Sequence, residues 1–167
     1  MSKIFILIFF GIFYFYPIAS FGVEKIKLGL LVPITGNDSK LGKQIIKSTR
    51  AALKDINTQN LEIYIKDTNS NPTTTLKSAK EFVEMGVKIV IGPVFYKSLT
   101  YLDEVNEITF LSLTNKTFKL PNNTISAGIN ASSQLNTIKK FIELNDIKKT
   151  IFLTPKLDYE DEINRAI

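Results

Sequence analysis

Cysteine, histidine and tryptophan are all absent from this sequence of 167 residues. Without histidine or cysteine, the chain cannot build a Ser-His-Asp triad, a cysteine nucleophile, a zinc finger, a histidine-ligated haem or an internal disulfide. Any catalysis would have to use carboxylates, lysine, tyrosine or hydroxyl groups. The length suits one domain, and a domain of this size buries enough surface to fold without disulfides.

Arginine is scarce, because the 21 basic residues include only Arg50 and Arg165. With 16 acidic residues the formal net charge is +5, which could attract nucleic acid. Bidentate recognition of phosphate or guanine favours the planar guanidinium group, however, and the lysines here are scattered along the chain. We therefore predict a solvated lysine-rich surface and no nucleic-acid partner.

One long hydrophobic run lies at the start of the chain. After a short positive start, residues 4–16 are apolar, and residues 17–22 end the run with small side chains. This three-part plan predicts a secretory signal peptide over residues 1–22, which is cleaved to leave a periplasmic mature chain. Extension of the run through Phe21 keeps an uncleaved membrane anchor as the alternative. Because no cysteine is present, we do not expect a lipoprotein.

Beyond residue 22, predicted strands and helices alternate. Short β-branched runs predict strands, and apolar side chains at helical spacing predict amphipathic helices. The expected strands cover residues 25–32, 61–66, 87–91, 108–113 and 150–153, and the expected helices cover 41–57, 72–85, 97–106, from a cap at Ser132 or Ser133 to 144, and 160–167. Repeated β-α-β units imply an α/β fold with a doubly wound, mostly parallel sheet.

Three local patterns carry further predictions. Apolar and polar side chains alternate over residues 61–66, which predicts a strand near a sheet edge. Asn71 and Pro72 are residue types favoured at the N-cap and first position of a helix. Residues 114–130 are rich in Asn, Thr, Ser and Lys, which predicts a crossover between two lobes.

A binding site is expected in the loops at the carboxyl ends of the strands, where ligands of such sheets bind. These loops cover residues 33–37, 67–71, 92–98, 114–117 and 154–159. Residues 36–44 do not match a phosphate-binding loop, because five residues separate the glycines and no hydroxyl follows the lysine. The acidic run at 158–162 is explained by the start of a helix, where the macrodipole favours negative side chains. We predict neither a cofactor nor a metal.

Two of these loops place polar groups close to strand ends. Residues 92–98 begin with Gly-Pro, continue through Tyr96 and bring Ser98 to the start of a helix, where free N–H groups favour an anion such as a carboxylate. Thr114 and Asn115 follow the next strand and can donate and accept hydrogen bonds toward the same crevice. The alternative for residues 92–98 is a capped loop without a ligand.

The order of motifs resembles a known family. The motifs are KLGLLVPITG at 27–36, Leu41-Gly42, Lys66-Asp67-Thr68 with Asn71-Pro72, IVIGP at 89–93, and Ser98. In this order after a signal peptide, they resemble the type 1 periplasmic-binding fold of leucine/isoleucine/valine-binding proteins. The segments at 67–68, 92–95 and 112–115 resemble the branch of penicillin-binding protein activators. The missing lipobox favours the soluble solute-binding proteins, so both branches stay open.

This resemblance implies a protein of two lobes. Residues 23–120 would form an incomplete first lobe, and residues 121–167 the crossover and the beginning of the second. Members of the family are longer, so we expect a fragment or a truncated reading frame. Such a piece would leave apolar faces uncovered.

The resemblance also implies ligand residues. The equivalents of Ser98 and Thr114 would hold the carboxylate and ammonium groups of an amino acid from the first lobe, and Tyr159 would contact it from the second. Two positions depart from the pattern. Leu41 stands where many amino-acid binders have an aromatic residue, and Glu160 stands where a glycine usually follows the tyrosine.

The implied function is binding, not catalysis. We expect an exported protein that closes two lobes over a small polar solute, an amino acid, and delivers it to the permease subunits of an ABC importer. The alternative is a cell-wall regulator that docks on a peptidoglycan synthase. A carboxylate-based hydrolase ranks third, because outside the run at 158–162 no pair of acids falls on one predicted loop.

Overall fold

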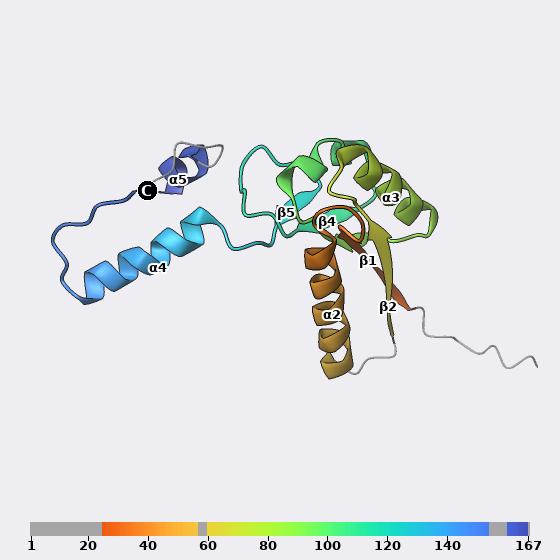
Figure 1. Cartoon of the computed structure of the whole chain (residues 1–167), viewed down its shortest axis with the longest axis horizontal. Helices are drawn as coiled ribbons and strands as arrows, with labels where there is room; N and C mark the ends of the chain where they lie inside the picture. Colours follow the sequence, from red (N-terminus) through yellow and green to blue (C-terminus); the bar gives the residue numbers. More distant parts are fainter. Residues whose placement is uncertain (1–24, 57–59, 154–159, 167) are drawn as a thin grey trace, which may run out of the picture.

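The structure, a computed structural model, describes residues 25–56, 60–153 and 160–166. The predicted signal peptide at 1–22 and Tyr159 of the predicted site lie outside these residues. Figure 1 shows a sheet with helices on both faces and a pair of C-terminal helices that extends to one side.

The sheet has five strands, all parallel. They are β1 (Ile26–Val32), β2 (Leu61–Asp67), β3 (Ile89–Ile91), β4 (Thr109–Ser112) and β5 (Thr124–Ser126), in the order β2-β1-β3-β4-β5. The predicted parallel α/β sheet is confirmed, and β2 lies at its edge as the alternating pattern predicted. β5 was not predicted. It falls inside the segment 114–130, which was expected to be only a crossover, and pairs with β4.

Helices cover both faces of the sheet. They are α2 (Ser39–Ile56), α3 (Pro72–Glu84), and the 3-10 helices η1 (Tyr96–Leu99) and η2 (Leu102–Glu104). α2 and α3 lie on opposite faces, as a doubly wound fold requires (Figure 1). The single helix predicted over residues 97–106 is wrong. Tyr101 separates η1 from η2 because its backbone, at φ −119° and ψ 9°, leaves the helical region.

The core lies between α3 and the middle strands. Phe82 of α3 and Phe110 of β4 are fully buried and share one cluster with Leu31 and Val90. A Cβ atom on Gly29 would lie 2.9 Å from Cε2 of Phe82, so the bare backbone of β1 lets the ring rest on the sheet. Burial of one such side chain stabilises the fold by roughly 1.5–3 kcal/mol. This packing fixes the strands whose ends carry the loops of interest.

The ends of α3 follow the sequence prediction. Oδ1 of Asn71 accepts hydrogen bonds from the N–H groups of Thr73 at 2.9 Å and Thr74 at 3.1 Å. Pro72 is the first helical residue, where its missing N–H has no cost. At the other end Gly86 adopts a φ of +73°, which glycine reaches without a steric penalty. The helix therefore stops where the chain must turn toward β3.

The C-terminal arm, residues 131–166, contains two helices. They are α4 (Ala131–Leu144) and α5 (Glu160–Ala166), and they pack against each other. The predicted cap of α4 is wrong, because Asn130 is the N-cap and its Oδ1 accepts the N–H of Ser133 at 2.9 Å. The Ser133 hydroxyl donates instead to the backbone oxygen of Asn130. The large apolar side chains of Phe141 and Leu144 are exposed.

Residues 150–153 were predicted to form a strand, and this prediction is wrong for the structure. Residues 150–153 have no regular secondary structure, and Ile151 and Leu153 are exposed. The segment has β-forming residues but no neighbouring strand within the described part of the chain, and a strand without a partner leaves its backbone unpaired. Of the helices in the described residues, none has the length and apolar character needed to cross a membrane.

Candidate functional site

The carboxyl ends of all five strands lie at one edge of the sheet, because the strands are parallel. The strand order reverses at β1, since β2 lies on one side of it and β3 on the other. Ligands of doubly wound sheets bind at such a reversal. The loops after β1, β3 and β4 are therefore in the expected position for a site.

Asp67, at the end of β2, ties the first two loops together. Its carboxylate accepts hydrogen bonds from the N–H of Ile34 at 2.7 Å, the hydroxyl of Thr35 at 2.5 Å and the N–H of Asn69 at 2.9 Å. Partial burial alone would raise the pKa of Asp67, but these hydrogen bonds outweigh it and hold the pKa below its ordinary value. Because these donors come from the loops after β1 and β2, Asp67 holds the two loops together.

Pro93 joins the loops that follow β3 and β4. Its backbone oxygen accepts hydrogen bonds from the Ser112 hydroxyl at 2.9 Å and from the N–H of Leu113 at 3.0 Å. Gly92 has a φ of +106°, and a Cβ atom there would lie 2.1 Å from the backbone oxygen of Leu31. Only glycine allows the chain to leave β3 this close to β1, and this turn carries residues 93–98 toward β4.

Ser98 is the most unusual of the predicted site residues. Its side chain is 1% exposed, and its Oγ has no hydrogen-bond partner among the described residues. It lies inside η1, where its N–H donates to the backbone oxygen of Phe95 at 3.0 Å. The N–H of Ser98 is therefore not among the free N–H groups predicted for the start of this helix, because the turn of the 3-10 helix already uses it. The hydroxyl remains as the group with unused hydrogen-bonding capacity.

Thr114 is also buried, and its N–H, Oγ1 and backbone oxygen each take part in a hydrogen bond. Its N–H donates to Oγ of Ser112 at 3.3 Å, and its Oγ1 accepts the N–H of Lys116 at 3.3 Å. Its backbone oxygen accepts the Ser126 hydroxyl at 3.0 Å. A Cβ atom on Gly128 would lie 2.3 Å from the same oxygen, so glycine is needed where the chain passes over Thr114.

Asn115 and Tyr96 lie nearer the surface than Ser98 and Thr114. Asn115 is exposed. The Tyr96 hydroxyl donates to the backbone oxygen of Lys119 at 3.2 Å, and Nζ of Lys116 lies 4.2 Å from the centre of its ring. A shallow groove of about 380 Å³ borders Tyr96 and Lys119. The predicted residues of the first lobe thus lie on two adjoining loops.

Glu162 of α5 meets the loop after β4, and the sequence analysis missed it. Its Oε1 accepts the N–H of Thr117 at 2.7 Å and the Thr117 hydroxyl at 2.5 Å. Glu162 is 3% exposed, whereas Asp161 is exposed. The helix macrodipole explains an exposed carboxylate such as Asp161 but not a buried one. No sequence signal could indicate this contact, because Thr117 is 45 residues away.

Residues 25–167 match a family described as periplasmic binding protein. The chain belongs to the periplasmic binding protein family. The predicted type 1 periplasmic-binding fold is confirmed by this match and by the sheet topology together.

A protein related in sequence and two solved structures are similar to parts of this chain. Leu/Ile/Val-binding protein homolog 1 of Brucella abortus (strain 2308) is 35% identical over 71 residues, which are 39% of this chain and 19% of that protein. Full-length LpoA from Haemophilus influenzae superposes with a TM-score of 0.70 and 17% identity over 86% of this chain and 26% of LpoA. The leucine binding protein LivK from Thermotoga maritima gives a TM-score of 0.57 and 17% identity over 84% of this chain and 44% of LivK.

These relatives include both solute-binding proteins and a regulator. The C-domain of LpoA is described as a regulator of PBP1A. The match to the Brucella protein covers 19% of its length, and the matches to LpoA and LivK cover less than half of theirs. The activities of the whole relatives therefore come to this chain only as proposals.

Proposed function

We propose that this protein is an extracytoplasmic solute-binding protein that binds an amino acid and presents it to the permease subunits of an ABC importer. The signal-peptide pattern at residues 1–22 and the membership of the family support an exported, periplasmic protein. No catalytic step is needed for this role. Binding would shift the population of the two lobes toward a closed form, because the closed form has the higher affinity.

The buried hydroxyl of Ser98 carries this proposal. A buried polar group without a partner costs about 1–3 kcal/mol, and a ligand that pairs with the Ser98 hydroxyl would remove this cost. Ser98 lies on the loop that Pro93 ties to the end of β4, beside the segment of Thr114 and Asn115. A ligand carboxylate or ammonium group would supply the missing partner once the loops around Ser98 open to admit it, because in this form the chain's own atoms cover the hydroxyl. Tyr159 is proposed to contact the same ligand from the second lobe.

Thermal unfolding with added amino acids tests the proposal. Leucine, isoleucine, valine and a set of polar amino acids are added separately, and a ligand that binds the folded state raises the Tm as its concentration rises. The variant Ser98→Ala should lose this rise without losing stability, because its hydroxyl has no partner to leave behind. If none of the amino acids raises the Tm of the wild-type chain, the proposal fails.

Ser78→Ala is the matched control for this experiment. Ser78 is a buried serine of α3 whose hydroxyl donates to the backbone oxygen of Asp67 at 2.8 Å. Its removal should lower stability by about 1 kcal/mol. The rise in Tm with ligand should persist, because Ser78 lies outside the proposed site. A loss of the rise in both variants would mean that stability, and not binding, is being measured.

A second candidate is a regulator that docks on a peptidoglycan synthase. Its support is that the chain's own atoms cover Ser98 and Thr114, which are 1% and 3% exposed, so the fold could act through its outer surface. The C-domain of LpoA is described as a regulator of PBP1A, and full-length LpoA has a similar fold. Co-purification with a peptidoglycan synthase, together with no response to amino acids, would favour this candidate.

A further inference from the structure

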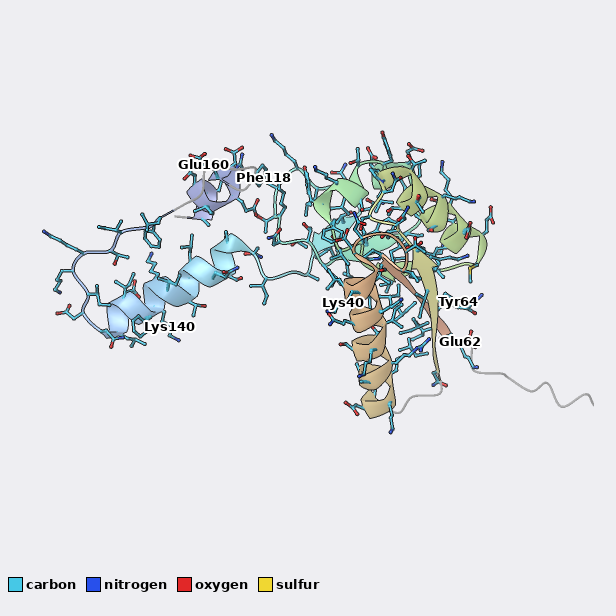
Figure 2. All side chains as sticks on the ribbon, viewed as in Figure 1. Lys40, Glu62, Tyr64, Phe118, Lys140 and Glu160 are labelled. Atoms are coloured by element: carbon cyan, nitrogen blue, oxygen red, sulfur yellow. The ribbon has the colours of Figure 1, made fainter. Side chains whose placement is uncertain are left out.

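Two pairs of side chains join α5 to the loop after β4. Oε1 of Glu162 accepts both the N–H and the hydroxyl of Thr117, and Cζ of Arg165 lies 4.4 Å from the centre of the Phe118 ring. Figure 2 shows the labelled Phe118 next to α5. Two successive loop residues thus contact one helix at two places.

Both contacts are made from the same face of α5. Glu162 and Arg165 are three residues apart in a helix, so they lie on one face. Both hydrogen bonds from Thr117 go to one carboxylate oxygen, and the guanidinium group over the Phe118 ring adds a cation-π contact. Glu162 is buried and its second oxygen has no partner among the described residues, so the two hydrogen bonds from Thr117 compensate for the lost hydration of the carboxylate.

The same loop carries the proposed ligand residues. Thr114 and Asn115 lie in this loop, separated from Thr117 by Lys116, and Tyr159 comes directly before α5 in the sequence. A contact between Thr117 and Glu162 therefore links the two sides of the proposed site. The helix partner of α5 is α4, whose side chains Phe141 and Leu144 are exposed, so α4 alone gives α5 little anchorage on the sheet.

We propose that Thr117, Phe118, Glu162 and Arg165 form a clasp that sets the position of the arm relative to the sheet. Glu162 is a positioning residue that acts through Thr117 on the segment of Thr114 and Asn115. Only the consequence of the clasp for ligand binding rests on the proposed function. The clasp itself is a property of the unliganded chain.

Distance measurement between two spin labels tests the clasp without any ligand. The chain has no cysteine, so labels introduced through Lys40→Cys in α2 and Lys140→Cys in α4 report one distance. Both positions are exposed and lie on opposite sides of the clasp (Figure 2). We expect one narrow distribution for the otherwise unchanged whole chain. In Glu162→Ala the distribution should broaden and gain a population at longer distance.

Two further variants keep this test decisive. Glu162→Gln retains an oxygen acceptor for Thr117 and should restore most of the narrow distribution, which a loss of folding would not allow. Asp161→Asn removes one negative charge from the same helical turn without touching Thr117 and should match the wild-type distribution. Equal distributions in Glu162→Ala and the wild type, or equal broadening in Asp161→Asn, would overturn the clasp. If amino acids fail to bind but the distances change as expected, only the proposed function is rejected.

Discussion

The sheet region, residues 25–126, and the C-terminal arm use similar apolar patterns with different results. In the sheet region Phe82 and Phe110 are fully buried, whereas in the arm Phe141 is 60% exposed and Leu144 is 76% exposed. Both regions have amphipathic helices of ordinary length. The periodicity of a sequence therefore predicts which side chains share a face, but not whether another element covers that face.

Replacing one phenylalanine in each region should give the largest difference in the free energy of unfolding. Phe82→Ala is expected to lower the free energy of unfolding by about 3–5 kcal/mol, because it removes buried surface and leaves a cavity. Phe141→Ala should cost about 0.5 kcal/mol or less, as is usual for surface positions. Urea unfolding followed by circular dichroism measures both values. Equal losses in the two variants would mean that the arm is covered in solution.

Replacing one aspartate in each region should give the next largest difference in the free energy of unfolding. Asp67→Asn is expected to cost about 1.5–3 kcal/mol at neutral pH, because four groups donate to a charged carboxylate there. Asp146 in the arm is exposed and pairs with Lys148 in an exposed ion pair, which contributes little. Asp146→Asn should therefore leave the free energy of unfolding unchanged.

The effect at Asp67 should also depend on pH. Because the pKa of Asp67 is lower in the folded chain than in the unfolded chain, its stabilising effect is complete above the unfolded value of about 4. The effect is lost as the pH falls through the folded pKa. Urea unfolding at several pH values should show wild type and Asp67→Asn converging in acid. A constant difference down to the lowest pH would contradict this account.

The two helix caps give the smallest expected difference. Asn71→Ala removes two hydrogen bonds at the start of α3 and should cost about 1 kcal/mol of global stability, since α3 covers the core. Asn130→Ala removes one from α4, which packs mainly on α5. It should fray α4 locally, with less effect on the main transition. Hydrogen exchange of the first-turn amides would separate local fraying from global unfolding.

The sequence predicted the central sheet well, because its signals are local. Strand runs, the edge position of β2 and the Asn71 cap all depend on neighbouring residues. β5 was missed because three residues carry no periodicity, and its existence depends on pairing with β4. Residues 150–153 show the opposite case. Their sequence has a strong strand pattern, but the described part of the chain offers no strand for them to pair with.

The candidate site was predicted less completely than the fold. The positions of Ser98 and Thr114 at strand ends were expected, but their burial comes from segments elsewhere, such as the passage of Gly128 over Thr114. Glu162 could not be assigned, because an acidic residue in a first helical turn already has a simple explanation. Contacts between distant segments are what local patterns omit.

The order of strands in the sheet has a consequence for how the chain assembles when its N-terminus emerges first. β2 and β3 each pair with β1, β4 pairs with β3, and β5 pairs with β4. Within this sheet, every strand after the first therefore meets a partner that has already appeared. Growth can proceed outward from β1 in the direction of synthesis or export, which shortens the time that any strand spends with both edges unpaired.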